Sequence, residues 1–287
     1  MGNPDDSTTI EDPATVGFVT RRVDRWRHGQ ATHEDDCVAE EMPIAMVYNG
    51  VSFAVMMATP HDLHDFALGF SLSEGLIQAP EQLLDVQVDT LLEGIKVAMQ
   101  VAPEAHAAHL DRAHERLLSG RSGCGICGTR DLEQAIRQNP PVGAGGTLTR
   151  DALERALAQL QTRQPMNAAT GAVHAAAWAD SNGDILLVRE DVGRHNALDK
   201  LIGAMRCADI DPNAGMALIT SRASYEMVTK SASAGITVLA AISAPTALAI
   251  ELARSAGITL IGFTRPGSHN IYTHPDRLIP AHPREPR

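Results

Sequence analysis

Apolar residues follow two patterns along the second half of the chain: short continuous runs, and recurrence at helical spacing. Three apolar runs are bounded by polar residues on both sides, as is typical of strands buried on two faces: 216–220, 236–240 and 258–263. Apolar residues recur at helical spacing in three further segments: 196–206, 225–234 and 245–255. Because right-handed strand–helix–strand units bring successive strands into parallel pairs, this pattern predicts an α/β layer structure.

Two β-hairpins are predicted where an Asn-Gly pair separates two β-prone segments. Both residues of such a pair accept the positive φ that a two-residue hairpin turn requires. The pairs are Asn49 and Gly50, within 43–58, and Asn182 and Gly183, between 173–179 and 184–189. After the first hairpin, a capping hydroxyl on Thr59 followed by a proline predicts that a helix starts there.

Composition divides the chain into two domains and a tail. Residues 1–15 are polar and acidic, which predicts a disordered tail. Proline and glycine dominate 140–146, the clearest break in composition. Together with the predicted elements, this organisation indicates a smaller N-terminal α+β domain at 16–118 and a larger α/β domain at 119–287, which begins with a cysteine loop.

The charge of the chain argues against several classes of partner. Lys and Arg number 24 against 35 Asp and Glu, which gives a net charge of −11 at pH 7. This balance argues against broad electrostatic binding to nucleic acid or to an anionic membrane. No apolar run approaches the ~20 residues that a membrane span requires, and the first residues lack the basic start of a signal peptide. Since there are only four cysteines and no export signal, we expect a cytoplasmic protein.

Candidate chemistry concentrates in residues 120–130, where Cys124 and Cys127 lie among four glycines. Because each glycine weakens a helix by about 1 kcal/mol relative to alanine, we expect a loop here. Cysteine reacts as its thiolate, and the positive charges of Arg121 and Arg130 would stabilise that anion. The spacing alone also fits half of a zinc site or an inert loop, although the other two cysteines stand apart from each other.

Polar residues follow each apolar strand of the second half. In an open α/β sheet, ligands collect where the strands end. Four cations are therefore expected to converge on one edge and to bind an anionic, phosphate-bearing ligand: Arg194, Arg222, Lys230 and Arg265. Two neutral or titratable neighbours, His195 and Ser221, belong to the same clusters. Each residue also has a purely structural interpretation, since serines cap helices and histidines often serve the fold alone.

Six separated motifs occur along the chain in a characteristic order: 41–50, 59–75, 123–128, 190–200, 221–228 and 243–246. Together they resemble the FdhD family of formate dehydrogenase accessory proteins, and the resemblance extends from about residue 37 to residue 280. It implies a cytidine-deaminase-like layered core in the larger domain, and it implies a homodimer.

The resemblance also implies an activity. A carrier of this family takes sulfur from a cysteine desulfurase as a persulfide and passes it to the molybdenum bis(molybdopterin guanine dinucleotide) cofactor, its bound substrate, on behalf of formate dehydrogenase. Cys124 corresponds to the cysteine that bears the persulfide, and Cys127 is its expected helper. The stretch that corresponds to the cofactor-binding segment comprises Phe263, Thr264, Arg265, Pro266, Gly267 and Ser268.

Two other functions are compatible with parts of the sequence. A non-catalytic chaperone would bind the molybdenum cofactor at the strand ends and would not use the thiols. A zinc-dependent deaminase would need His-x-Glu followed downstream by Pro-Cys-x-x-Cys, whereas here the cysteine pair precedes His174 and three alanines follow it. We therefore assign no metal ligands. One departure from the family is Ala172, where a second glycine is expected, and its side chain would limit a close backbone approach to a ligand.

Overall fold

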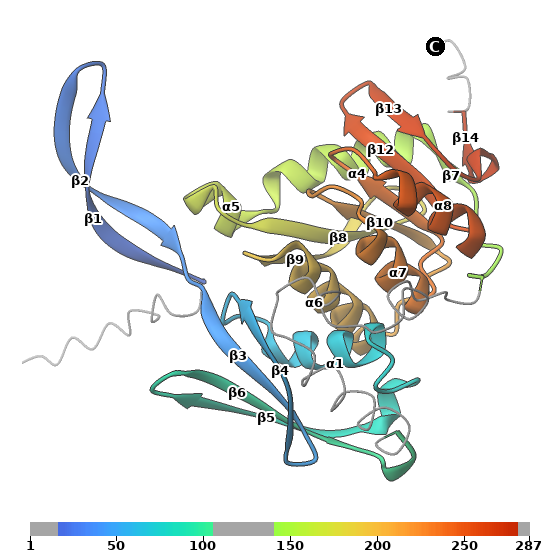
Figure 1. Ribbon diagram of the computed structural model, residues 1–287. Coiled ribbons are helices and arrows are strands. Elements are labelled where there is room, and N and C mark those ends of the chain that lie inside the picture. Colours follow the sequence, from blue (N-terminus) through green and yellow to red (C-terminus); the bar gives the residue numbers. More distant parts are fainter. Residues whose placement is uncertain (1–16, 106–140, 281–287) are drawn as a thin grey trace, which may run out of the picture.

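The computed structural model is a mixed α/β structure with several sheets, and it describes residues 17–105 and 141–280 (Figure 1). The predicted tail at 1–15, the loop with Cys124 and Cys127, and the predicted domain boundary at 118 lie outside the described residues. Each of the two described stretches forms a sheet with its own buried core.

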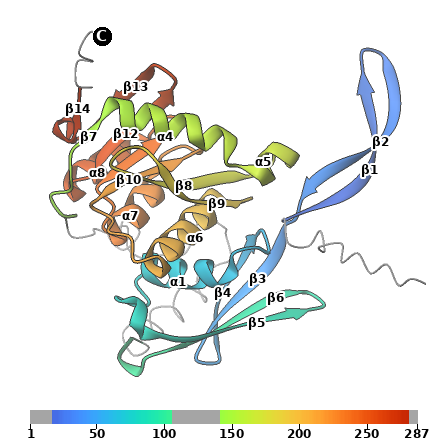
Figure 2. The same ribbon diagram turned by 180° about the vertical axis from the view of Figure 1, so that it is seen from behind.

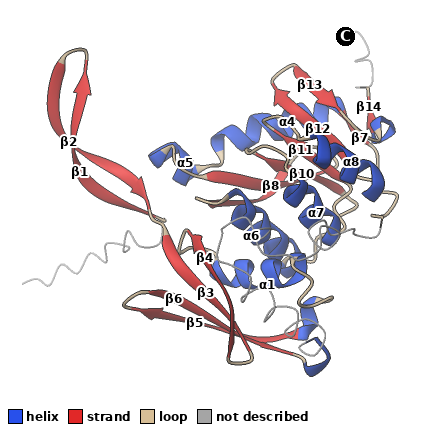
Figure 3. Cartoon of the chain, in the orientation of Figure 1, coloured by secondary structure: helices blue, strands red, loops and turns tan. Residues whose placement is uncertain are grey.

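A six-stranded sheet organises residues 141–280, with the strand order β13-β12-β11-β10-β8-β9 (Figure 3). Its strands are β8 (His174–Asp180), β9 (Ile185–Asp191), β10 (Gly215–Ile219), β11 (Val238–Ala241), β12 (Thr259–Arg265) and β13 (Ser268–Ile271). β10, β11 and β12 are parallel, whereas β8 runs antiparallel to both β10 and β9. The predicted parallel pairing is confirmed, and so is the hairpin predicted at 182–183.

Helices cover both faces of this sheet (Figures 1 and 2). They are α4 (Arg150–Thr162) on one face, and α6 (Arg194–Cys207), α7 (Tyr225–Ser233) and α8 (Ala247–Ala256) on the other. The alternation of side chains along each strand produces these layers, since Ala177 and Ala179 of β8 pack with α4, whereas Ala176 and Trp178 pack with the other helices. Among the described residues, no helix combines the length and the apolar character needed to cross a membrane.

A four-stranded sheet with one helix forms most of the N-terminal stretch, in the order β4-β3-β6-β5. Its elements are β3 (Met42–Tyr48), β4 (Val51–Ala58), α1 (Leu63–Ser73), the 3-10 turn η2 (Pro80–Gln82), β5 (Leu83–Leu91) and β6 (Gly94–Val101). Asn49 and Gly50 join β3 to β4 with φ of 47° and 83°, as predicted for this hairpin. Phe66 and Phe70 of α1 fill the core beneath the sheet.

A two-stranded arm extends from this unit beside a short helix (Figure 1). The arm pairs β1 (Phe18–Arg27) with β2 (Gln30–Ala39), and the helix is α5 (Pro165–Thr170). A small parallel pair joins β7 (Leu148–Thr149) to β14 (Leu278–Ile279), which follows the 3-10 turn η3 (Pro275–Arg277).

The helix start predicted at Thr59 is wrong. α1 begins at Leu63, and the preceding Asp62 has a left-handed φ of 54°. Thr59 is fully buried, and its backbone nitrogen donates to Asp191 Oδ2 at 3.0 Å while its hydroxyl accepts from the nitrogen of Val192 at 3.2 Å. A long-range contact to the other half of the chain therefore uses the hydroxyl that the local pattern assigned to a helix cap.

Two glycines let α1 and α6 cross in backbone contact, which joins the two units (Figure 2). A Cβ built at Gly69 of α1 would lie 2.7 Å from the nitrogen of Gly203 and still closer to the carbonyl oxygen of Asp199. A Cβ at Gly203 of α6 would lie 2.9 Å from the Cα of Asp65 and closer to its carbonyl. The N-terminal unit is thereby packed directly on the helical layer of the six-stranded sheet.

Candidate functional site

The ends of five strands meet at one edge of the six-stranded sheet. β9, β10, β11 and β12 run in the same direction, and β8 runs opposite to them. The edge therefore carries the last residues of four strands, Asp191, Ile219, Ala241 and Arg265, and the first residue of β8, His174. We call it the polar edge, because polar residues follow each of these strand ends. The strand ends that the sequence predicted to converge do lie together.

Arg194 and His195 form the first turn of α6 at the polar edge. His195 Nε2 lies 2.8 Å from Glu226 Oε2 of α7, and the Arg194 guanidinium lies 3.9 Å from the same oxygen. Burial raises the pKa of the Glu226 carboxyl, but the hydrogen bond and charge of His195 and the charge of Arg194 outweigh burial and lower it. Glu226 is consequently an anion that holds both basic side chains in place.

Glu190, just before the polar edge, fixes the start of α5. Its two carboxylate oxygens accept from the backbone nitrogens of Met166 and Asn167 at 2.9 and 2.8 Å. Burial raises the pKa of this carboxyl, and the two backbone hydrogen bonds offset only part of the rise. Through Glu190, the end of β9 sets the position of a helix that borders the same edge.

The neighbouring Asp191 orders the loop that leads into α6. Its Oδ1 accepts from the nitrogen of Gly193 at 2.7 Å and from Asn196 Nδ2 at 3.0 Å. Its Oδ2 lies 2.6 Å from Lys200 Nζ, and both side chains are fully buried. Gly193 and Asn196 flank Arg194 and His195 in the chain. By binding both flanking residues, the Asp191 carboxylate fixes the backbone that carries the two basic side chains.

β12 ends in a bulge that turns Phe263 outwards. The register with β13 shifts between Gly262 and Arg265, and Phe263 has a φ of 52°, which is uncommon for a residue other than glycine. The nitrogen of Phe263 donates to the carbonyl of Ser243 at 3.1 Å, and the residue is 46% exposed. The bulge thus places a half-exposed aromatic residue at the polar edge, and such a ring is able to stack on a flat ligand ring.

The remaining residues of the predicted cofactor-binding stretch differ in exposure. Thr264 is buried, and its hydroxyl donates to a carbonyl of β11 at 2.9 Å. Arg265 is exposed, and its guanidinium donates to the carbonyls of Thr264, at 3.1 Å, and Ile242. The turn into β13 is exposed throughout: Pro266, Gly267 and Ser268. Thr264 therefore holds the strand end in place, while Arg265 and the turn face solvent.

Ser221 and Arg222 follow β10 and have different surroundings. Ser221 is 5% exposed, and its hydroxyl donates to the carbonyl of Arg222 at 3.1 Å. The Arg222 side chain is exposed and forms no ion pair with any other described residue. Arg222 is therefore available to a ligand, whereas Ser221 shapes the turn.

Lys230 does not lie with the other predicted cations. It is buried between α7, α1 and α6, where its ammonium donates to Asp199 Oδ2 and Ser73 Oγ at 2.9 Å and to Glu74 Oε1 at 2.8 Å. Burial alone would lower the pKa of Lys230, but the charges of Asp199 and Glu74 outweigh burial and raise it. The prediction that Lys230 faces a ligand at the edge is corrected, because its charge is satisfied inside the helical layer.

Sequence reasoning did not select His174 or Glu226, although both belong to the polar edge. Burial lowers the pKa of the His174 imidazole, and the charges of Arg194 and His195 lower it further, so the ring is neutral at pH 7. The position of His174 at the start of a predicted strand was a usable signal, since that strand begins where its neighbours end. In the described part of the chain, no group of three His, Cys, Asp or Glu side chains is arranged to hold a metal ion.

A layered α/β unit with cationic and aromatic side chains at its strand ends is typical of a protein that binds an anionic ligand at a sheet edge. The sequence matches the FdhD/NarQ family over residues 39–279. A relative from Xanthomonas campestris, named sulfur carrier protein FdhD, is 57% identical over 266 residues, which cover 93% of this chain and 94% of that protein. A relative of the same name from Cupriavidus necator is 54% identical over 259 residues, which cover 90% and 89% of the two chains.

The fold is similar to that of a solved structure. A crystal structure from Desulfotalea psychrophila, assigned to a formate dehydrogenase accessory protein, superposes with a TM-score of 0.72 at 24% identity and covers 91% of this chain and 99% of that chain. Because the family match spans most of the sequence and the relatives match nearly end to end, the chain belongs to the FdhD/NarQ family.

Proposed function

We propose that this protein is a sulfur carrier that accepts sulfur from a cysteine desulfurase as a persulfide on Cys124 and transfers it to the molybdenum bis(molybdopterin guanine dinucleotide) cofactor that formate dehydrogenase requires. The observation that carries the proposal is the 57% identity, over 93% of this chain, to a relative named sulfur carrier protein FdhD. The glycine-flanked pair Cys124 and Cys127 supplies the nucleophiles that such a carrier needs.

Two thiol exchanges account for the transfer. The Cys124 thiolate attacks the outer sulfur of the desulfurase persulfide, so that a new S–S bond forms on Cys124 and the desulfurase thiolate leaves. The Cys127 thiolate then attacks the inner sulfur of the Cys124 persulfide, which forms a Cys124–Cys127 disulfide and releases hydrosulfide to the molybdenum. A dithiol reductant then reduces the Cys124–Cys127 disulfide to two thiols and is itself oxidised to a disulfide.

The polar edge is the proposed binding surface for the cofactor, which is the substrate of the transfer. Arg194, Arg222 and Arg265 would bind its phosphates, and Phe263 would stack on one of its flat rings. His195 and the exposed turn residues Pro266, Gly267 and Ser268 are further proposed contacts. The buried side chains of Ser221 and Thr264 are proposed to support the site instead, by holding the turn that carries Arg222 and the strand end that carries Arg265. We further propose the cytidine-deaminase-like layering, a homodimer and a cytoplasmic location as the setting of this reaction.

The persulfide is tested by mass spectrometry of the full chain after incubation with a cysteine desulfurase and cysteine. One additional sulfur atom is expected on the protein, and peptide mapping is expected to assign it to Cys124. A Cys124→Ala variant is expected to remain unloaded and to leave formate dehydrogenase inactive. Sulfur on Cys37 or Cys207 instead, or full activation by the Cys124→Ala variant, contradicts the proposal.

Cys127 is expected to affect delivery more than loading. A Cys127→Ala variant retains the Cys124 thiolate and should acquire sulfur, but it lacks the thiol that displaces the outer sulfur, so formate dehydrogenase activation should slow. The comparison is made on preloaded protein, by following sulfur loss and enzyme activation together. If a variant with alanine at both positions activates the enzyme fully, a non-catalytic cofactor chaperone explains the function better.

A further inference from the structure

The arm of β1 and β2 projects away from both units of the structure and has an open strand edge (Figures 1 and 2). Among the described strands, β1 pairs only with β2, so the backbone groups along its other edge meet no strand. An open edge of ten residues is a template for pairing with another chain, and a two-stranded ribbon alone is marginally stable in water. The arm therefore has the structure of a docking element.

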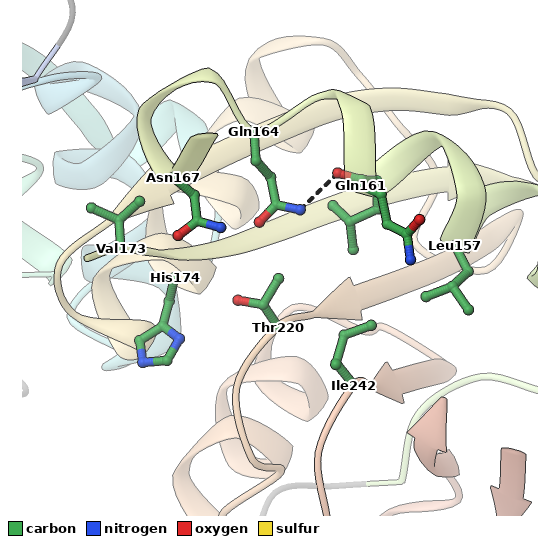
Figure 4. A pocket seen from close by; sticks show the side chains of 9 residues that line it. Leu157, Gln161, Gln164, Asn167, Val173, His174, Thr220 and Ile242 are labelled. Carbon is green, nitrogen blue, oxygen red and sulfur yellow. Dashed lines mark hydrogen bonds between the residues drawn. The ribbon is translucent and has the colours of Figure 1, made fainter. Parts of the chain in front are cut away.

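Of the two strands of the arm, β2 is the one that packs on the rest of the molecule. It contacts α5, a helix that also borders a cavity of about 310 Å³ at the polar edge through Asn167 (Figure 4). The arm is thus attached beside the polar edge through β2. The open edge that remains for a partner is that of β1.

The two strands of the arm differ in charge. β1 carries four arginines and one aspartate, whereas β2 carries three acidic residues and no lysine or arginine. If two arms paired edge to edge about a two-fold axis, β1 would meet β1 or β2 would meet β2, and like charges would oppose each other. Pairing of β1 with β2 of another copy is head-to-tail and does not give a two-fold dimer. The charges therefore favour a different protein as the partner of β1.

The side chains of β1 alternate between two faces of the arm. One face carries Arg21, Arg25 and Arg27, and the other carries Arg22 and Trp26. Arg25 forms ion pairs with two acidic residues of β2, at 2.6 and 2.9 Å. Arg21 and Arg27 are exposed, and neither forms an ion pair with another described residue. Trp26 is 71% exposed. One face of the strand thus offers unpaired positive charge, and the other offers an aromatic ring.

We propose that the open edge of β1 binds an extended segment of a partner protein in which acidic and apolar residues alternate. The segment adds a strand to the arm through backbone hydrogen bonds. Its acidic side chains lie on the face of Arg21 and Arg27, and its apolar side chains contact Trp26 on the other face. Because positive charge on an edge strand opposes pairing with basic strands, the charge also selects the partner.

The test uses a fluorescein-labelled peptide of alternating glutamate and valine, seven residues long, and follows its fluorescence anisotropy as the full chain is added. Saturable binding is expected. A second peptide with lysine in place of glutamate reverses the charge. A third peptide has every backbone nitrogen methylated, so it keeps the charge but donates no backbone hydrogen bond. Both control peptides should bind at least about tenfold more weakly than the acidic peptide.

Arg27→Gln and Arg22→Gln are the matched variants of the protein. Both remove one exposed charge from β1, but only Arg27 lies on the proposed acidic-binding face. Arg27→Gln should weaken binding of the acidic peptide about threefold, and Arg21→Gln with Arg27→Gln about tenfold, whereas Arg22→Gln should bind like the parent. Trp26→Ala should also weaken binding about tenfold. None of these residues belongs to a buried core cluster, so the two units should remain folded.

Four results would overturn the proposal. They are failure of the acidic peptide to bind, equal binding of either control peptide, equal weakening by Arg22→Gln and Arg27→Gln, and occupation of β1 by a second copy of the chain. Sedimentation equilibrium detects the last of these as a dimer that the acidic peptide dissociates. The titration contains neither sulfur nor a desulfurase, so its outcome is separate from that of the persulfide experiment.

Discussion

Alanine at Gly69 is expected to destabilise the protein by more than about 3 kcal/mol, the upper part of the range for overpacked sites. In a helix, alanine gains about 1 kcal/mol over glycine, so propensity alone predicts stabilisation. Packing makes the expected change in stability unfavourable instead, because the new Cβ would lie 2.7 Å from the nitrogen of Gly203 and closer to the carbonyl of Asp199. Both neighbours are backbone atoms of α6 and cannot rotate away, so α1 and α6 must separate.

Urea unfolding of purified protein measures this loss, and Gly146→Ala is its matched control. A Cβ at Gly146 would meet the carbonyl oxygen of Asn213 at 3.6 Å, an ordinary contact, so its stability should stay within about 0.5 kcal/mol of the parent. Gly203→Ala should repeat the large loss from the other helix, since its Cβ meets Asp65. Parent-like stability of Gly69→Ala would show that the two units are joined less closely than their backbones indicate.

Local patterns predicted the central sheet and both Asn-Gly hairpins, because a run of apolar residues or a turn dipeptide carries its own structural preference. The arm was not predicted as a pair of ten-residue strands. Of the residues in β1, four are arginines, and the strands cover no core, so the period-two apolar signal is weak. A strand that buries little side-chain surface leaves little trace in the sequence.

Long-range polar contacts explain where prediction of the site failed. Thr59 has the local signature of a helix cap but bonds to Asp191, 132 positions later. Lys230 has the signature of an exposed strand-end cation but bonds to Ser73, 157 positions earlier. Nothing in the local sequence distinguishes a cation that awaits a ligand from one that is paired inside. The strand ends could be placed at one edge from topology, whereas the side chains that face solvent could be identified only from the fold.

Lys200→Met is expected to lower the free energy of unfolding by about 3–5 kcal/mol, the usual cost of removing one partner from a buried ion pair. Lys200 and Asp191 are fully buried, and their charged atoms lie 2.6 Å apart. The methionine side chain is flexible, apolar and similar in length to the aliphatic part of lysine, so it keeps most of the packing. The main loss is therefore the positive charge. Asp191 would remain buried without a cation, and the carbonyl of Thr59 would lose a donor at 3.0 Å. Urea unfolding measures the change.

Lys96→Met makes the same substitution at an exposed pair and serves as the control. Lys96 Nζ lies 2.7 Å from Asp89 Oδ2, but the two side chains are 39% and 47% exposed. Water screens such pairs, so the expected loss is below about 1 kcal/mol despite the similar distance. Equal losses in Lys200→Met and Lys96→Met would mean that burial does not set the cost.

A double-mutant cycle separates the ion pair from the ordering of the loop. Asp191→Asn combined with Lys200→Met leaves no unpaired buried charge, so the double variant should be more stable than the sum of the single losses predicts, by about 1–3 kcal/mol. Full recovery is not expected, because Asp191 also accepts from Gly193 and Asn196. Those bonds order the turn that carries Arg194 to the polar edge. Strict additivity would contradict the pairing and would assign both losses to packing alone.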